Sequence, residues 1–255
     1  MINNLPQVTK NILILNIVMF VVTLILENQG IDLGGQLGAH YINSALFQPY
    51  QIITHFFMHA DFFHILFNMY AFIILGAHLE RIWGPQRFFI FYVACALGAF
   101  GLYNIIGVYQ LAELKSQLSQ EIPLSRLDIM LQNMSGRDQL LDIYNSFLSD
   151  NSINSSTSLI EYVNLTTTPM VGASGAIFGI MAAFAILFPN TEFLIYFTIP
   201  VKAKYLVAAY FAYELYASFQ NSAGDNVAHL AHVGGAIVGA VLVLIWRKKD
   251  RTNFW

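Results

Sequence analysis

The sequence predicts an all-α protein built as a bundle of six transmembrane helices. The first observation is composition: 56% of the residues are hydrophobic and 11% are charged, whereas a soluble domain carries roughly 25% charged residues. The second observation is the positive mean hydropathy of +0.56, which also indicates a membrane protein. The third observation is a series of apolar stretches, each near the ~20 residues that cross a bilayer. They cover residues 11–26, 62–83, 86–108, 173–188, 203–219 and 228–246.

Two of these stretches leave alternatives open. No small-residue cleavage site cleanly follows the first stretch, so we expect a retained helix and not a signal peptide. Between the fourth and fifth stretches, Pro189 and Pro200 flank the semi-apolar segment 193–199. That segment fits either an interfacial segment or part of a tilted helix.

Basic residues predict the orientation of the bundle. Nine of them fall on one side of the predicted helices, namely Lys10, Arg81, Arg87, Lys202, Lys204, Arg247, Lys248, Lys249 and Arg251. The excess of basic residues in short loops marks the cytoplasmic side, so we expect both termini in the cytoplasm. Because no transit peptide precedes the first helix, we expect the bacterial inner membrane. The net charge of −3 argues against a nucleic-acid partner.

We expect one membrane domain over residues 1–255, with a polar insertion at 110–168 on the side opposite the termini. Two groups of apolar residues in the insertion recur at helical spacing and predict two short amphipathic helices. These groups are Leu127, Met130, Leu131 and Met134, and Leu140, Leu141, Tyr144, Phe147 and Leu148. The segment 150–168 is rich in Ser, Asn and Thr and predicts a loop.

Ser174 is the first candidate for chemistry. It stands in Gly172-Ala173-Ser174-Gly175, where the polar insertion gives way to an apolar helix. Backbone N–H groups at a helix start have no partner within the helix and can stabilise an oxyanion. The alternative is that the small residues only allow helices to pack closely, since Gly175 and Gly179 form a packing motif.

His232 favours the catalytic interpretation, because an ionisable side chain inside a span is costly and usually functional or paired. Small residues around Ser174 and His232 would let the two helices approach, and a neutral imidazole can accept the serine proton. His229, one turn earlier, is an alternative base but fits a structural hydrogen bond better. No Asp or Glu lies near enough in sequence to nominate a third member, so we expect a Ser174–His232 dyad.

His64 and Asn68 are four residues apart and share one helix face, so both can donate hydrogen bonds toward one point. They predict an oxyanion clamp; the alternative is a polar patch that joins helices. A metal site is a further alternative, since histidines are numerous: His55, His59, His64, His78, His229 and His232. The chain lacks H-E-x-x-H, and no carboxylate accompanies the histidines at ligand spacing. Cys95 is the single cysteine, so we expect neither a metal nor another cofactor.

Together these motifs resemble the rhomboid family of intramembrane serine proteases. They follow the family order, from His64 and Asn68 through Gly76-x-x-x-Glu80-x-x-x-Gly84 and Gly172-Ala173-Ser174-Gly175 to Ala231-His232-x-Gly234-Gly235. The resemblance implies a six-helix bundle with Ser174 as nucleophile and His232 as general base. It also implies oxyanion donors from His64, Asn68 and the Ser174 backbone. Substrates would be single-span membrane proteins, cleaved in or near the bilayer.

The sequence departs from the family pattern at three places, two of which concern access to the site. Tyr50-Gln51 stands where many members have Trp-Arg in the first extracytoplasmic loop, which puts the usual anchoring of that loop in doubt. Phe178 stands where some members have a Tyr that stacks on the base. The insertion is longer than in simple bacterial members, and we expect it to screen or recruit substrates. Unchanged cleavage of several substrates after deletion of 115–165 would contradict that expectation.

Two other classes of function compete with a protease. A catalytically silent rhomboid-like protein would bind membrane clients without cleaving them, although the presence of both Ser174 and His232 speaks against it. A small transporter would also carry glycines and histidines in its spans. Transporters usually show repeated halves, and no convincing internal duplication is present.

Overall fold

The structure is a computed structural model, and it describes residues 4–134, 136–195, 198–220 and 228–249. Within these residues, four helical segments are long and apolar enough to cross a bilayer: Gln7–Glu27, Phe62–Trp83, Pro85–Leu118 and His229–Lys248. A shorter apolar helix covers Ser174–Leu187. The all-α, polytopic class predicted from the composition is therefore confirmed. Arg251, which was used to predict orientation, lies outside the described residues.

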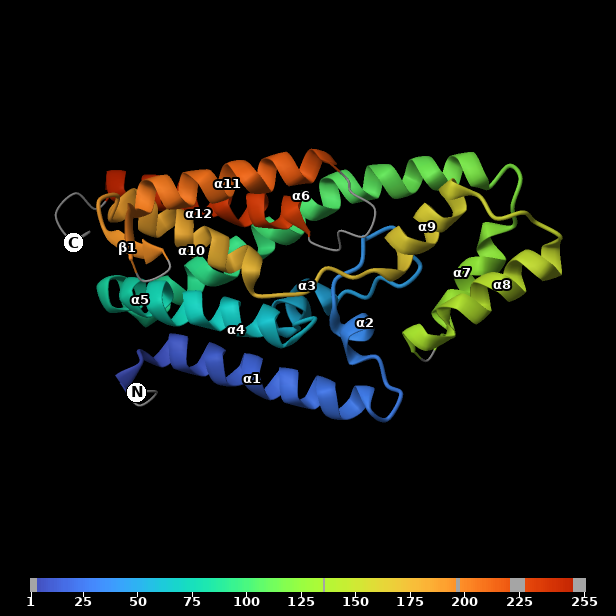
Figure 1. Cartoon of the computed structure of the whole chain (residues 1–255), viewed down its shortest axis with the longest axis horizontal. Coiled ribbons are helices and arrows are strands. Elements are labelled where there is room, and N and C mark those ends of the chain that lie inside the picture. The colour runs from blue at the N-terminus through green and yellow to red at the C-terminus, as the bar shows by residue number, and fades with distance from the viewer. Residues whose placement is uncertain (1–3, 135, 196–197, 221–227, 250–255) are drawn as a thin grey trace. The chain divides into compact units, whose positions relative to one another are not determined.

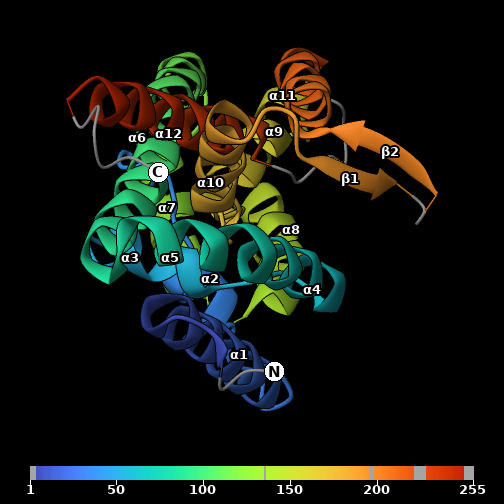
Figure 2. The ribbon, with the colours of Figure 1, turned by 90° about the vertical axis from the view of Figure 1, so that its left-hand side faces the viewer.

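Helices occupy all six predicted positions. They are α1 (Gln7–Glu27), α4 (Phe62–Ala71) continuing through the π-helical turn η3 (Phe72–Gly76) into α5 (Ala77–Trp83), α6 (Pro85–Leu118), α10 (Ser174–Leu187), α11 (Ala203–Gln220) and α12 (His229–Lys249). α6 continues to Leu118, beyond the predicted end at residue 108. For the segment between α10 and α11, the alternative of a tilted helix is wrong, and the alternative of an interfacial segment stays a prediction. The segment contains an antiparallel hairpin of β1 (Glu192–Ile195) and β2 (Ile199–Lys202), which extends sideways from the start of α11 in Figure 2.

The chain divides into two compact units, which are described separately. The first unit comprises Met1–Val18, His59–Tyr103 and Gly172–Trp255, and the second comprises Met19–Met58 and Asn104–Val171. The expectation that 1–255 forms a single domain stays a prediction.

In the first unit, α10 and α12 pack backbone against backbone (Figure 1). A Cβ atom placed on Gly235 would lie 1.8 Å from the carbonyl oxygen of Gly175, and one on Gly239 would lie 2.6 Å from that of Gly179. A Cβ on Gly179 would lie 2.4 Å from Sγ of the buried Cys95 on α6. Glycine is therefore required along this contact, as the small-residue pattern predicted.

Glu80 fastens the start of α1 to α5. Its carboxylate accepts hydrogen bonds from the backbone N–H of Val8 at 2.8 Å and from both the N–H and the hydroxyl of Thr9 at 2.7 Å. A carboxylate at a helix N-terminus satisfies donors that have no partner within the helix. Glu80 is 3% exposed, and its role in this unit is structural.

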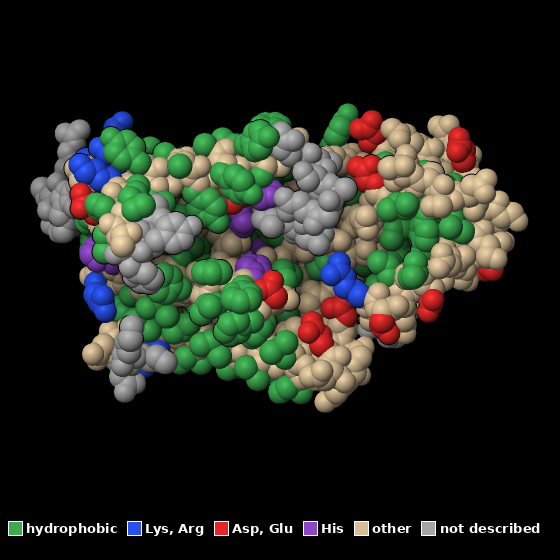
Figure 3. All heavy atoms as spheres, viewed as in Figure 1, with side chains coloured by type: hydrophobic (Ala, Val, Ile, Leu, Met, Phe, Trp, Pro, Cys, Tyr) green, Lys and Arg blue, Asp and Glu red, His purple; other side chains and the backbone are tan. Residues whose placement is uncertain are grey.

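The surface of the first unit suits lipid. Large hydrophobic side chains on α4 are exposed, among them Phe62, Phe63, Phe67 and Tyr70. Figure 3 shows hydrophobic side chains over much of the visible face in the region of α4 and α11. Apolar side chains cost nothing when they face hydrocarbon, so this exposure fits a membrane bundle.

The second unit contains the described part of the insertion together with the loop that follows α1. Its elements are α2 (Leu33–Leu37), α3 (Gln51–Thr54), η2 (His55–Phe57), α7 (Leu124–Gln132), η4 (Arg137–Gln139), α8 (Leu140–Asn151) and α9 (Thr157–Thr167). α7 and α8 agree with the two predicted amphipathic helices. The predicted loop at 150–168 is wrong over α9. The hydroxyl of Ser156 caps this helix by accepting from Leu159 N–H, and Leu159, Tyr162, Val163 and Thr166 form its buried face.

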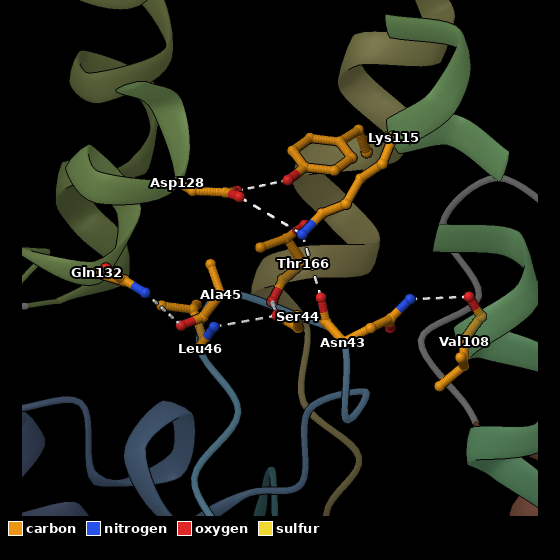
Figure 4. A network of polar contacts seen from close by, with 10 residues as sticks. Asn43, Ser44, Ala45, Leu46, Val108, Lys115, Asp128, Gln132 and Thr166 are labelled. Carbon is orange, nitrogen blue, oxygen red and sulfur yellow. Dashed lines mark hydrogen bonds and ion pairs between the residues drawn. The ribbon is translucent and has the colours of Figure 1, made fainter. Parts of the chain in front are cut away.

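Polar contacts tie the insertion to the loop after α1 (Figure 4). The Lys115 ammonium donates to the carbonyl oxygen of Asn43 at 3.1 Å and lies 3.5 Å from the Asp128 carboxylate. The Ser44 hydroxyl donates to the Thr166 carbonyl oxygen at 3.1 Å, and the Gln132 amide to that of Ala45 at 2.9 Å. The insertion and this loop thus form one folded unit.

Gln51 anchors the same loop in place of the arginine expected from the family pattern. Its side-chain oxygen accepts from the N–H groups of His40 and Gln48, at 3.3 and 3.1 Å. Its side-chain nitrogen donates to the carbonyl oxygens of Gln36 and Leu46, at 3.1 and 3.2 Å. A side chain that is 1% exposed therefore satisfies four backbone groups, and the loop does not lack an anchor.

Candidate active site

Ser174 is the first residue of α10, and Ala173 is the cap that precedes it. The hydrogen bond from Ile177 N–H to the Ala173 carbonyl oxygen, at 3.0 Å, closes the first turn. The N–H groups of Ser174 and Gly175 come before that bond, so the helix itself offers them no carbonyl. The hydroxyl of Ser174 therefore stands beside backbone donors, as the sequence predicted.

His232, in the first turn of α12, meets this serine. Its Nε2 atom lies 2.8 Å from Ser174 Oγ, within hydrogen-bond distance. The imidazole is 12% exposed and stacks on the ring of Phe178, with ring centroids 4.3 Å apart and planes inclined by 7°. The phenyl ring thus takes the stacking position that the resemblance assigned to an aromatic side chain.

Glu214 is the site residue that the sequence reasoning missed. This carboxylate on α11 is 2% exposed, and its Oε2 atom lies 2.9 Å from Nδ1 of His232 and 2.6 Å from Nδ1 of His229. His229 therefore has the structural hydrogen bond expected of it. A signal for Glu214 was present, because an acidic residue within a predicted span is as costly in lipid as the histidine that was singled out.

His64 lies across from Ser174 at the edge of a small space beside Gly172. A Cβ atom on Gly172 would lie 2.9 Å from Nε2 of His64 and 3.3 Å from Ser174 Oγ. Nδ1 of His64 accepts a hydrogen bond from Ala60 N–H at 3.3 Å. A neutral imidazole that accepts at Nδ1 carries its proton on Nε2, so His64 presents a donor to the space beside Ser174.

Asn68 lies one turn after His64 on α4 and is 8% exposed. Its side-chain nitrogen donates to the carbonyl oxygen of His64 at 2.9 Å. An amide nitrogen carries two protons, so this bond uses half of its donor capacity. Asn68 therefore braces the turn that carries His64, and it retains the chemistry of an oxyanion donor.

Glu214, His229 and His232 also form a set of potential metal ligands. One donor atom from each lies within 4.8 Å of the others. Two histidines and a glutamate make up a donor set that binds zinc in some hydrolases. The hydrogen bonds from both imidazoles to Glu214 account for the same arrangement without an ion, and both interpretations can be tested.

A family model described as a rhomboid domain matches residues 46–112 and 123–249. An uncharacterized mitochondrial rhomboid protein of Schizosaccharomyces pombe is 37% identical over 89 residues, which cover 32% of this chain and 23% of that protein. The mitochondrial RHOMBOID-like protein 12 of Arabidopsis thaliana is 28% identical over 190 residues, 74% of this chain and 44% of that protein. The matches therefore span less than half the length of either relative.

Proposed function

Since the chain belongs to the rhomboid family, we propose that it is a serine endopeptidase that cleaves other membrane proteins within or near the bilayer. The observation that carries this proposal is the 2.8 Å contact between Ser174 Oγ and His232 Nε2. A hydroxyl within hydrogen-bond distance of an imidazole is the arrangement that activates serine as a nucleophile. Membership of the family is also compatible with a catalytically silent protein, so the experiments below test for activity.

In the proposed reaction, His232 removes the proton of Ser174 as the oxygen attacks the substrate carbonyl carbon. The protonated imidazole then delivers that proton to the leaving amine, and water releases the acyl enzyme by the reverse sequence. Phe178 lies flat against His232. An aromatic face stabilises a cation placed over it, so this ring favours the imidazolium that forms during the reaction.

The proposed oxyanion site comprises Nε2–H of His64, the side-chain amide of Asn68 and the backbone N–H of Ser174. Gly172 leaves open the space between His64 and Ser174, since a Cβ there would come within 3.3 Å of both side chains. Donors already in place around developing charge lower the barrier without reorganising in the transition state.

The proposed substrates are single-span membrane proteins in the surrounding lipid bilayer. A fully hydrogen-bonded helix hides its carbonyl carbons, so the substrate segment must unwind locally before attack. The proposed reaction uses neither a cofactor nor nucleic acid.

The protein is a multi-pass membrane protein, and we propose that both of its termini face the cytoplasm of a bacterial cell. The relatives are named as mitochondrial, so a mitochondrial membrane is the competing location. Alkaline phosphatase fused after residue 249 should be inactive in a bacterial host, and phosphatase inserted near residue 120 should be active. The opposite pattern of phosphatase activity would contradict the proposed orientation. Fractionation of the native cells would show whether the protein lies in a bacterial or a mitochondrial membrane.

The central test uses Ser174→Ala and His232→Ala with a single-span reporter in membranes. Each variant should lose cleavage by about 10³-fold or more, since members of a catalytic unit act together. Ser218→Ala is the matched control, because the Ser218 hydroxyl donates only to the Leu215 carbonyl oxygen of its own helix among the contacts described. Cleavage that persists in either variant contradicts the proposed site.

A fluorophosphonate probe separates a protease from a silent member of the family. The probe should label the wild type and Ser218→Ala but not Ser174→Ala, because it reacts with an activated serine and needs no substrate. A wild-type protein that folds, carries no label and cleaves no reporter would instead support the silent, client-binding function.

A further inference from the structure

A buried carboxylate inside a membrane protein needs a reason, because an unpaired charge in that environment is costly. Glu214 is 2% exposed and makes hydrogen bonds to two imidazoles, at 2.6 and 2.9 Å. On this geometry we propose that Glu214 is a positioning residue that completes a Ser174–His232–Glu214 triad. The inference rests on the proposed protease function and extends the expected dyad by one member.

The hydrogen bonds determine which nitrogen of His232 carries the proton. An ionised carboxylate can only accept, so Nδ1 of His232 donates to Glu214 at 2.9 Å. A neutral imidazole has one N–H, which leaves Nε2 as an acceptor toward Ser174 Oγ at 2.8 Å. Glu214 therefore selects the tautomer in which His232 can act as a base.

The same contact serves the charge that develops during acylation. As the Ser174 oxygen forms its bond to the carbonyl carbon, the carbonyl π electrons move to oxygen and the hydroxyl proton passes to His232 Nε2. The imidazole becomes a cation between the Phe178 ring and the Glu214 carboxylate. Glu214 keeps its charge throughout, and the proton later leaves with the amine.

His229 holds Glu214 in place for this task. His229 and His232 are three residues apart on one face of α12, and both Nδ1 atoms reach the same oxygen of Glu214. Two donors from one helix fix the position of a carboxylate that comes from another helix. Among the residues that the structure describes, Tyr210 and Tyr213 on α11 and His64 on α4 are further titratable groups near this cluster.

Glu214→Gln tests the proposal, because glutamine has the same shape without the charge. Its NH₂ group can turn toward Nδ1 of His232 and favour the wrong tautomer. We expect kcat for the reporter to fall by about 10²- to 10⁴-fold with little change in KM. We also expect the acidic limb of the rate of fluorophosphonate labelling to move to lower pH, because no anion then supports the protonated imidazole.

Two further variants complete the design. Glu80→Gln is the matched control, since it removes another buried carboxylate from the same unit, one that holds the backbone of α1. It should lower the melting temperature and leave the pH profile of labelling unchanged. Glu214→Asp keeps the negative charge on a side chain shorter by one methylene, and it should retain more activity than Glu214→Gln.

The outcomes separate this inference from the proposed function. If the wild type neither cleaves the reporter nor reacts with the fluorophosphonate probe, the proposed protease function is contradicted. If the wild type is active and Glu214→Gln is equally active, only the triad is contradicted. The same holds if Glu214→Gln loses rate but keeps the pH profile of the wild type. A loss of wild-type activity in EDTA that zinc restores would also overturn the triad, because Glu214 would then be a metal ligand.

Discussion

At the scale of single residues, Gly172 decides whether the space beside the serine stays open. Its φ of +124° is a backbone conformation that side-chain-bearing residues rarely adopt. Any Cβ would also approach His64 Nε2 and Ser174 Oγ, at 2.9 and 3.3 Å. The backbone requires glycine here for its conformation, and the site requires it for its volume.

Gly172→Ala should therefore reduce reporter cleavage by about 10²-fold or more, as expected when one oxyanion contact is lost. Gly84→Ala is the matched control, because Gly84 also has a positive φ, of +79°, but a Cβ there meets nothing within 4 Å. Both variants should lose about 1–3 kcal/mol of stability from backbone strain. Equal cleavage by the two variants, normalised to folded protein, would show that the space beside Gly172 does not matter.

The candidate residues of the site could be identified from the sequence where they stand in short motifs. Ser174, His232, His64 and Asn68 each stand in a local pattern that could be read without a structure. Glu214 stands in no such pattern, because its partners lie 15 and 18 residues away on another helix. Only the packing of α11 against α12 brings them together.

At the scale of elements, the contact between α10 and α12 sets the distance between Ser174, the proposed nucleophile, and His232, the proposed base. Each helix brings one side chain of the proposed dyad in its first turn, and glycines follow on both helices. The carbonyl oxygen of Gly175 occupies the position where a side chain of Gly235 would begin. The geometry of the pair is thus fixed by two backbones in direct contact, not by flexible side chains.

Gly235→Ala should separate these two helices, because its Cβ would lie 1.8 Å from the Gly175 carbonyl oxygen. We expect a lower melting temperature, by an amount that corresponds to about 1–3 kcal/mol of overpacking, and slower labelling of Ser174. Gly101→Ala on α6 is the control, since a Cβ there meets nothing within 4 Å. A Gly235→Ala protein that melts and reacts like Gly101→Ala would contradict the close contact.

Two elements were not predicted from the sequence, each for its own physical reason. α9 has a composition typical of loops, and its helix depends on burying one face that includes Leu159 and Tyr162. The β1–β2 hairpin is an apolar segment too short for periodicity to distinguish a strand from a helix. For α9, burial against the rest of its unit decides the local structure, whereas the long apolar helices could be predicted from composition.

At the scale of the whole molecule, charge is distributed unevenly between the units. The second unit carries nine acidic and three basic side chains.

The loop after α1 in the second unit buries two histidines, His40 and His55, which are 1% and 2% exposed. Acidic pH therefore acts on the stability of this unit through the cost of charging buried imidazoles.

Burial lowers the pKa of His55 from 6.5 to about 4, partly offset by its hydrogen bond to the Gln51 carbonyl oxygen. Burial also lowers the pKa of His40. Between pH 6.5 and about pH 4, His55 is therefore protonated in the unfolded chain and neutral in the folded protein. Stability is thus complete above pH 6.5 and falls as the pH drops toward 4, by up to about 3 kcal/mol for His55.

Thermal melts in detergent between pH 7.5 and 4.5 measure this dependence. His55→Gln keeps a donor for the Gln51 carbonyl oxygen but cannot gain a proton, so its melting temperature should fall less steeply with acid. The wild type and the variant share every carboxylate, so the difference between their slopes isolates the imidazole. Parallel slopes would mean that His55 titrates as freely in the folded protein as in the unfolded chain.

The burial of Cys95 beneath Gly179 has a practical consequence for measurements on this protein. Cys95 is the single cysteine of the chain and is 0% exposed, so soluble thiol reagents cannot reach it while the protein is folded. The native sequence therefore serves directly as the background for introducing one reactive cysteine at a time. Spin labels or fluorophores can then be placed on either unit, and their separation measured in a bilayer, without disturbing the glycine contact that holds the site together.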